Sequence, residues 1–253
     1  MAVYAIADLH LSFGTDKPMD VFGGWQNYTE RIRQNWQRLV TEDDTVVIAG
    51  DISWAMKLQD TESDFRFINE LNGRKIIMKG NHDYWWTTKS KMDKFLEEKG
   101  FSTMSILHNN YYVCDGTALC GSRGWFYDAE TDADMLILRR EVGRLRMSIE
   151  PAVKDGYDPV VFLHYPPIYN NVECDEILEV LREYNIKKCF YGHIHGGNAS
   201  RRAFIGEKYG ISFRLIACDH IGFMPLAKKK KKKSDFSCCF NKKTVKFAKK
   251  KGH

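Results

Sequence analysis

The sequence lacks the features that mark membrane-spanning, secreted or disulfide-rich proteins. No stretch of the 253 residues approaches the ~18 consecutive apolar residues that a membrane-spanning helix needs. Residues 1–10 contain no basic segment followed by a long apolar run, so we do not expect a cleaved secretory signal. The seven cysteines form no CxxC pair, which excludes a zinc ribbon and a thioredoxin-like redox motif. We therefore expect a cytoplasmic protein with mostly reduced, buried cysteines.

Basic charge is concentrated at one end of the chain. The formal net charge is +5, but residues 228–253 hold twelve lysines and one aspartate, which leaves −6 for residues 1–227. The basic balance therefore gives no reason to infer a nucleic-acid function for the body of the protein. With 43% hydrophobic residues the chain can bury a core. We predict one globular domain over residues 1–227 and a solvated, flexible Lys-rich tail over residues 228–253.

Short apolar runs alternate with segments of helical periodicity. The runs predict buried strands at residues 3–7, 45–49, 75–79, 160–163 and 188–191, and shorter strands at 111–114, 118–121 and 213–218. The periodic segments predict helices near residues 32–39, 65–71, 92–96, 135–149 and 177–181. We expect Pro151 to end the fourth helix. This alternation is typical of a layered α/β fold in which strands are buried between helices.

Five of the predicted strands end in polar residues. In chain order these ends are Asp8-Leu9-His10, Gly50-Asp51, Gly80-Asn81-His82-Asp83, His164 and Gly192-His193-Ile194-His195. Ligands of open α/β sheets bind outside the carboxyl ends of the strands, so we expect these side chains along one rim. A glycine before Asp51, Asn81 and His193 lets the backbone approach a metal or a phosphate without a Cβ.

The polar strand ends combine carboxylate, imidazole and amide groups and contain no thiolate. This combination favours Mn, Fe or Zn over Ca²⁺ or a structural zinc. A pair of divalent metals with a bridging ligand is suited to phosphoester hydrolysis. A single DxH or HxH is commonly a helix cap or a surface histidine, but five such pieces in order, each after an apolar run, indicate a metal site.

The series D-L-H, G-D, G-N-H-D, H and G-H-I-H resembles the calcineurin-like metallophosphoesterase superfamily over residues 4–195. The resemblance implies a two-sheet α/β sandwich with flanking helices and a dinuclear metal centre at one edge. It assigns the metal ligands as Asp8, His10 and His195 for the first metal, Asn81, His164 and His193 for the second, and Asp51 as the bridge. It further implies that His82 is the proton donor or transition-state stabiliser, and that Asp83 orients its imidazole.

The resemblance implies a hydrolase that cleaves a phosphomonoester or a phosphodiester with hydroxide generated by two divalent metals, with Mn, Fe or Zn preferred. Protein Ser/Thr phosphatases of the superfamily carry a GDxVDRG block, but residues 52–56 here are ISWAM and contain no arginine. Leu11 also stands where those phosphatases have glycine. Both departures argue against a close protein-phosphatase relative. Arg123 is either a replacement phosphate ligand that binds substrate or an ordinary loop arginine.

Two other functions are compatible with the sequence. One is a non-catalytic scaffold on the same fold, although every ligand position is filled here. The other is a binder of nucleic acid or anionic surfaces, acting through weak polyanion or anionic-membrane contacts of Lys228 to Lys251. The body is acidic and shows no groove-reading motif, which disfavours the second alternative. The substrate stays open between phosphomonoester, phosphodiester, nucleotide and phosphoprotein.

Overall fold

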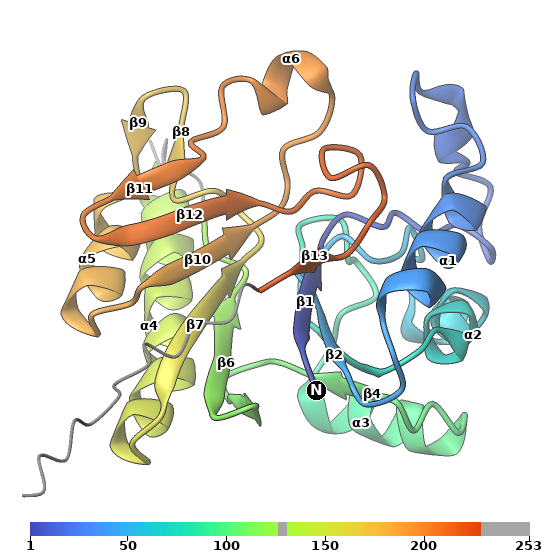
Figure 1. Ribbon diagram of the computed structural model, residues 1–253, viewed down its shortest axis with the longest axis horizontal. Coiled ribbons are helices and arrows are strands. Elements are labelled where there is room, and N and C mark those ends of the chain that lie inside the picture. Colours follow the sequence, from blue (N-terminus) through green and yellow to red (C-terminus); the bar gives the residue numbers. More distant parts are fainter. Residues whose placement is uncertain (126–130, 229–253) are drawn as a thin grey trace, which may run out of the picture.

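The computed structural model describes residues 1–125 and 131–228, which form two main β-sheets (Figure 1). The first, here called the N-terminal sheet, has the order β13 (Leu226–Ala227), β1 (Val3–Ile6), β2 (Thr45–Ile48), β3 (Arg74–Ile77) and β4 (Met104–Ile106). The second, the C-terminal sheet, has the order β11 (Gly206–Lys208), β12 (Ile211–Leu215), β10 (Lys188–Tyr191), β7 (Asp158–Leu163), β6 (Thr117–Ser122) and β5 (Tyr112–Cys114). Strands β1 to β4 are parallel, as are β6, β7, β10 and β12.

Helices cover the outer face of each sheet (Figure 1). The N-terminal sheet is covered by α1 (Tyr28–Leu39), α2 (Glu62–Glu70) and α3 (Lys89–Glu98), and the C-terminal sheet by α4 (Asp132–Lys154) and α5 (Asp175–Glu183). The smaller elements are η1 (Met19–Val21), η2 (Leu58–Thr61), β8 (Ile168–Tyr169), β9 (Val172–Glu173) and α6 (Gly197–Ser200). The layers are therefore helix, sheet, sheet and helix, which confirms the predicted two-sheet α/β sandwich.

The apolar runs form strands because both faces of each sheet are covered. In β2, Val46 and Ile48 pack under the helices, whereas Val47 packs between the sheets. Across that interior, the Phe162 and Phe190 rings of the C-terminal sheet stack with centroids 5.3 Å apart. Side chains alternate between the faces of a strand, so a strand buried on both faces needs a continuous apolar run.

The two sheets are joined near the carboxyl end of β1. The Ala7 N–H donates to the Ile216 carbonyl over 2.9 Å, and the Cys218 N–H donates to the Ala7 carbonyl over 3.0 Å. These bonds connect the segment after β1 to the segment after β12, which lie in different sheets. The carboxyl ends of both sets of parallel strands are thereby brought to one edge of the sandwich. This is the arrangement that the polar strand ends predicted.

One predicted boundary is wrong. Pro151 does not end the fourth helix, because α4 continues to Lys154. A proline lacks one N–H but leaves its own carbonyl available, and the Pro151 carbonyl accepts from the Asp155 N–H at 2.9 Å. Ala152 in the added turn is fully buried, and Gly156 follows with a φ of +82°. Burial and this glycine turn stabilise the last turn against the loss of one hydrogen bond.

The first residue of the predicted Lys-rich tail packs against the body of the protein. Lys228 is half-buried, its N–H donates to the Val3 carbonyl over 2.8 Å, and its Nζ donates to the Thr117 hydroxyl. It therefore continues the edge formed by β13, and is not solvated as the run of lysines predicted. The rest of the predicted tail, residues 229–253, lies outside the described residues.

The described cysteines and helices agree with what the composition predicted. The five cysteines in the described residues are all buried and free, as expected: Cys114, Cys120, Cys174, Cys189 and Cys218. Within residues 1–125 and 131–228, no helix combines the length and apolar character needed to span a bilayer.

Candidate metal centre

Four side chains form the first group of potential metal ligands. Asp8 and His10 follow β1, Asp51 follows β2, and His195 follows β10 in the other sheet; one N or O atom from each lies within 4.8 Å of the others. The His10 Nε2 is 3.0 Å from the His195 Nε2 and 3.7 Å from the Asp51 Oδ2. The Asp8 Oδ1 is 3.5 Å from the His195 Nε2. Nitrogen and oxygen lone pairs thus converge on one small volume.

The second group shares Asp51 with the first. Its other members are His164 after β7 and His193 after β10. The Asn81 Oδ1 lies 2.7 Å from the His164 Nε2 and 2.8 Å from the His193 Nδ1, so the amide oxygen belongs to the same group. The His164 Nε2 is 3.5 Å from the Asp51 Oδ1. All seven ligands predicted from the sequence are therefore brought together, in two groups that have Asp51 in common.

The environment of Asp51 fits a bound cation. Its carboxylate is 1% exposed, and its Oδ1 accepts from the His82 N–H at 2.8 Å. Its Oδ2 is buried without a hydrogen-bond partner among the described residues. A buried carboxylate oxygen without a partner is costly unless a proton or a cation compensates it.

The backbone places the ligands through strained or tightly packed turns. Asp8, His10, Asp51 and His193 have φ values of 63°, 45°, 50° and 70°. Such left-handed conformations are unfavourable for residues with a Cβ and occur where a site requires them. A Cβ on Gly80 would lie 2.1 Å from the Asp51 Oδ1, and one on Gly192 would lie 2.6 Å from the Asp8 Oδ2. Glycine is therefore required at both positions, because a side chain would collide with the carboxylate of Asp51 or of Asp8.

Burial keeps three of the histidines neutral. It lowers the pKa of His164 to about 3 and that of His193 to about 2, where the neighbouring His164 adds to the effect. Burial and the adjacent His195 also lower the pKa of His10 well below its usual value. A neutral imidazole has a free lone pair, which is the form that binds a metal.

The pKa values of Asp8, Asp51 and His195 are raised, in contrast to those of the other three histidines. Burial raises the pKa of Asp8 well above its usual value and raises that of Asp51, so both carboxylates favour a nearby positive charge. Burial lowers the pKa of His195, but the charges of Asp8 and Asp219 outweigh it and raise the value to about 9. A metal bound at His195 would therefore displace a proton at neutral pH.

His82 lies beside the first ligand group and is not a member of either group. Its ring centroid is 5.7 Å from that of His10 and 4.7 Å from the Trp54 ring. Its Nδ1 is 3.4 Å from the hydroxyl of Tyr84, whose side chain is 54% exposed. The imidazole thus lies between the ligands and the protein surface, a position from which it can reach a bound substrate.

The structure contradicts the expected role of Asp83. Its Oδ2 accepts from the N–H groups of Asp51 and Gly80 at 2.9 and 2.7 Å, and its Oδ1 accepts from the N–H of Ile52 at 2.8 Å. Trp85 also donates its indole N–H to the Oδ1 over 3.1 Å. The carboxylate is fully buried, and no described hydrogen bond joins it to the His82 imidazole. Asp83 therefore positions the two ligand-bearing turns and does not orient His82.

Arg123 lies close to the second ligand group without joining it. Its carbonyl accepts from the His164 N–H at 3.1 Å. Its guanidinium is 3.4 Å from the Glu141 carboxylate and lies 4.8 Å from the centroid of the Trp125 ring. The side chain is thus held by Glu141 and Trp125 beside the site, which is compatible with either role weighed from the sequence.

Sequence reasoning missed Asp219 and Trp54. The Asp219 Oδ1 is 3.6 Å from the His195 Nδ1, whereas the Nε2 of the same ring faces His10 and Asp8. The Asp219 Oδ2 accepts from the Gly196 N–H at 2.7 Å. Trp54 stacks on His10 with centroids 4.8 Å apart. Asp219 follows β12, so its position after a predicted strand was a usable signal. Trp54 follows Asp51 by three residues and carried no comparable signal.

The fold and the site together define a class of protein. Carboxylate, amide and imidazole groups that could hold metal converge at the edge of a two-sheet sandwich, which is typical of metal-dependent phosphoesterases. A family model described as calcineurin-like phosphoesterase matches residues 1–197, and the chain belongs to this family. The resemblance drawn from the motifs is confirmed.

Solved structures with a similar fold have low sequence identity. The protein of unknown function AQ665 from Aquifex aeolicus is 17% identical with a TM-score of 0.51, and the match covers 89% of this chain and 95% of that one. The protein TT1561 from Thermus thermophilus is 12% identical with a TM-score of 0.52, over 76% and 81% of the two chains. A search of curated proteins found no match. These likenesses concern the fold.

Proposed function

We propose that this protein is a phosphoesterase that hydrolyses phosphomonoesters or phosphodiesters at a dinuclear centre of Mn, Fe or Zn. The observation that supports this proposal best is the sharing of Asp51 by two ligand groups. A carboxylate with one oxygen toward each group is suited to bridge two cations. Two bound dications would supply a water-derived nucleophile near neutral pH and would neutralise charge on the phosphoryl oxygens.

The protein's own residues would divide the remaining tasks. Asp8, His10 and His195 would hold one metal, Asn81, His164 and His193 the other, and Asp51 both. His82 would donate a proton to the leaving oxygen from the surface side of the site. Trp54 packs on both His10 and His82, so it would limit the freedom of each imidazole.

Substrate class follows in part from what surrounds the site. Residues 52–56 follow Asp51, where protein phosphatases have their phosphate-binding arginine, and they contain no arginine. Within this segment the Trp54 ring packs against the imidazoles of His10 and His82. This aromatic cover favours small phosphoesters over a phosphorylated side chain on a folded protein. Arg123 would contact a second part of the substrate.

The direct test is a panel of p-nitrophenyl phosphate and bis-p-nitrophenyl phosphate, assayed with Mn, Fe, Zn and Mg on protein first stripped with a chelator. We expect turnover that depends on added metal, together with about two bound metals per chain by elemental analysis. Binding of metal without turnover of any phosphoester would instead support the scaffold on the same fold. Binding of neither metal nor substrate would contradict both functions.

The other functional alternative gains nothing from the described residues. This alternative is polyanion or anionic-membrane contact through Lys228–Lys251, and of that segment the structure describes only Lys228. The Lys228 ammonium donates to the Thr117 hydroxyl. A cytoplasmic location remains our proposal, supported by five buried free cysteines.

A further inference from the structure

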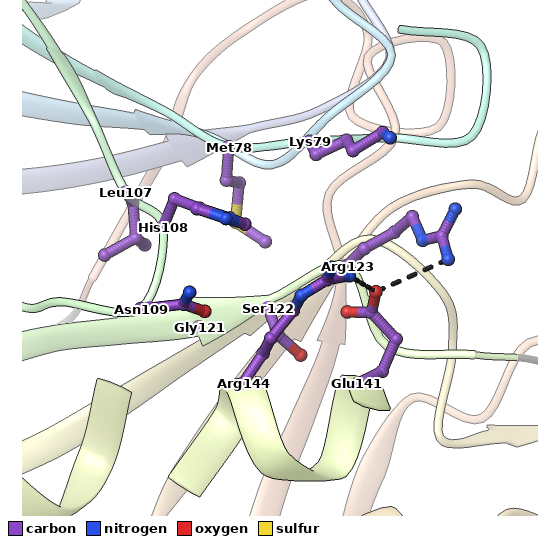
Figure 2. A pocket seen from close by; sticks show the side chains of 10 residues that line it. All are labelled: Met78, Lys79, Leu107, His108, Asn109, Gly121, Ser122, Arg123, Glu141 and Arg144. Atoms are coloured by element: carbon purple, nitrogen blue, oxygen red, sulfur yellow. Dashed lines mark hydrogen bonds and ion pairs between the residues drawn. The ribbon is translucent and has the colours of Figure 1, made fainter. Parts of the chain in front are cut away.

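A pocket beside the second ligand group gathers three cationic side chains from three elements (Figure 2). Lys79 follows β3, Arg123 follows β6, and Arg144 lies in α4. Glu141 is the single carboxylate among the residues that line the pocket. The pocket therefore has a net charge of +2 from these four side chains. Residues 1–227 as a whole have a net charge of −6, so this concentration of positive charge is local.

The ion pairs in the pocket leave polar atoms without partners. A single oxygen of Glu141, Oε1, accepts from both Arg123 and Arg144 (Figure 2). The other oxygen of Glu141 and the Nε of Arg123 are buried without hydrogen-bond partners among the described residues. Glu141 is 1% exposed and Arg123 16% exposed, so water does not readily solvate either group. The Arg123 Nε is a donor, which an anion could satisfy, whereas the Glu141 oxygen is an acceptor, which calls for an ordered water.

Lys79 is the cation that is least satisfied. It is half-buried, and no ion pair or hydrogen bond of its ammonium is recorded within residues 1–125 and 131–228. Figure 2 shows its side chain and the Arg123 guanidinium extending toward the same side of the pocket. The interior has room for about one water molecule, with about 20 Å³ of free space. An anion would therefore sit at the mouth, where Lys79 and the 37% exposed Arg144 reach solvent.

The pocket is adjacent to the metal centre along the chain and in space. Lys79 is two residues before Asn81, and the Arg123 carbonyl accepts from the N–H of His164. The Tyr165 ring lies 6.0 Å from the Arg123 guanidinium and 4.4 Å from the His193 ring. A molecule whose reacting phosphate lies at the metal ligands could therefore extend a second group past Tyr165 to the pocket.

We propose that Lys79, Arg123 and Arg144 form a subsite for a second phosphate group carried by the substrate. The guanidinium groups and the ammonium would contact its oxygens, and Glu141 would hold both arginines in place. The proposal rests on the phosphoesterase function proposed above and narrows its substrates to phosphoesters with a second phosphate. The subsite is separate from the metal ligands, so it can be tested by binding as well as by turnover.

The test compares adenosine 3′,5′-bisphosphate with AMP on the metal-loaded full chain, by calorimetric binding and by kcat/KM. Each measurement is expressed as the ratio of bisphosphate to AMP, so a general loss of activity cancels. In the wild type we expect a preference for the bisphosphate of about tenfold or more. Lys79→Met should abolish most of that preference, and Lys79→Arg, which keeps the charge, should retain it.

Lys91→Met is the matched control, because Lys91 is an exposed lysine of α3 outside this pocket and its loss changes the net charge equally. It should leave the ratio as in the wild type. Equal binding of the two nucleotides by the wild type, or a ratio that Lys79→Met does not change, would overturn the proposal. Lys79→Met could also weaken the binding of inorganic phosphate while the ratio of bisphosphate to AMP stays unchanged. The subsite would then bind free phosphate, and the assignment of substrates with a second phosphate would be wrong.

The binding ratio separates this proposal from the proposed function. A wild type that hydrolyses AMP but binds both nucleotides equally retains the phosphoesterase function and loses the subsite. A wild type that binds the bisphosphate preferentially in a Lys79-dependent way, but hydrolyses neither nucleotide nor any other phosphoester, retains the subsite and contradicts the enzyme.

Discussion

The two halves of the sandwich contribute different chemistry to the same edge. The N-terminal sheet supplies every oxygen donor of the candidate metal centre, from Asp8, Asp51 and Asn81, together with the imidazole of His10. The C-terminal sheet supplies only imidazoles, from His164, His193 and His195. The negative charge that would retain two dications therefore comes from one half, whereas the other half completes each group. We infer that loss of one residue of the N-terminal half, Asp51, would affect both metals, whereas loss of one histidine of the C-terminal half would affect a single metal.

The halves also differ in how their ligands are supported. In the N-terminal half, Asp83 accepts from backbone N–H groups on the Asp51 and Gly80 turns, so one buried carboxylate positions both. In the C-terminal half, the N–H of His193 donates to both oxygens of Asp8, at 3.0 and 2.9 Å. The C-terminal turn is therefore held partly by a ligand of the other half.

The largest effect should follow from Asp51→Asn. The bridging carboxylate serves both ligand groups, so we expect loss of both metals and a fall in turnover of about a thousandfold or more. His193→Ala is the matched comparison, because His193 belongs to one group, and it should lose about one metal per chain. Elemental analysis and phosphoester assays measure both. Equal metal loss in the two variants would show that the halves do not differ in this way.

His82→Ala should separate catalysis from metal binding. We expect the metal content to stay at the wild-type level while turnover falls by about 10²–10⁴-fold, the range for general acid–base catalysis. The loss should be smaller for p-nitrophenyl esters than for alkyl esters, because an acidic phenol needs no proton to leave. Depleted metal in His82→Ala would make His82 a ligand and would add an imidazole to the N-terminal half.

Asp219→Asn tests how the C-terminal half orients its imidazoles. The Asp219 carboxylate faces the His195 Nδ1, so its neutral amide should weaken metal affinity by about 10–100-fold, as is usual for partners of metal-binding histidines. Titration with Mn²⁺ followed by calorimetry measures the change. Asp175→Asn, at the start of α5, removes an equal charge away from the site and should leave the affinity unchanged. Similar affinities for Asp219→Asn and the wild type would show that His195 is held by packing alone.

The smallest effect on the site should come from removing residues 229–253. A protein that ends at Lys228 keeps the bonds of this residue to Val3 and Thr117, so we expect wild-type metal content and turnover on small phosphoesters. Loss of eleven lysines should weaken retention on heparin, with a steep dependence on salt. Heparin chromatography and thermal unfolding measure the two effects. Unfolding of the shortened protein would place residues after Lys228 in the folded domain.

The sequence by itself predicted the central strands and the five longer helices in their order along the chain, and it predicted the candidate ligands, but it missed the edge strands β4, β11 and β13. Buried parallel strands need continuous apolar runs, and ligands bind at the carboxyl ends of such strands, so the candidate ligands Asp8, Asp51 and His164 could be selected by position alone. Pro151 misled the prediction because local propensity disfavours a proline inside a helix, whereas burial of Ala152 stabilises the turn beyond it.

Only the tertiary structure decided which side chains meet across the sheets. Asp83 is next to His82 in sequence, but backbone N–H groups from two turns surround its carboxylate and draw it away from the imidazole. Asp219 reaches His195, Trp54 covers His10, and Lys79 shares a pocket with Arg123, all through contacts between segments distant in sequence. Spacing along the chain carries no information on such contacts, because they depend on how the two sheets pack and twist against each other.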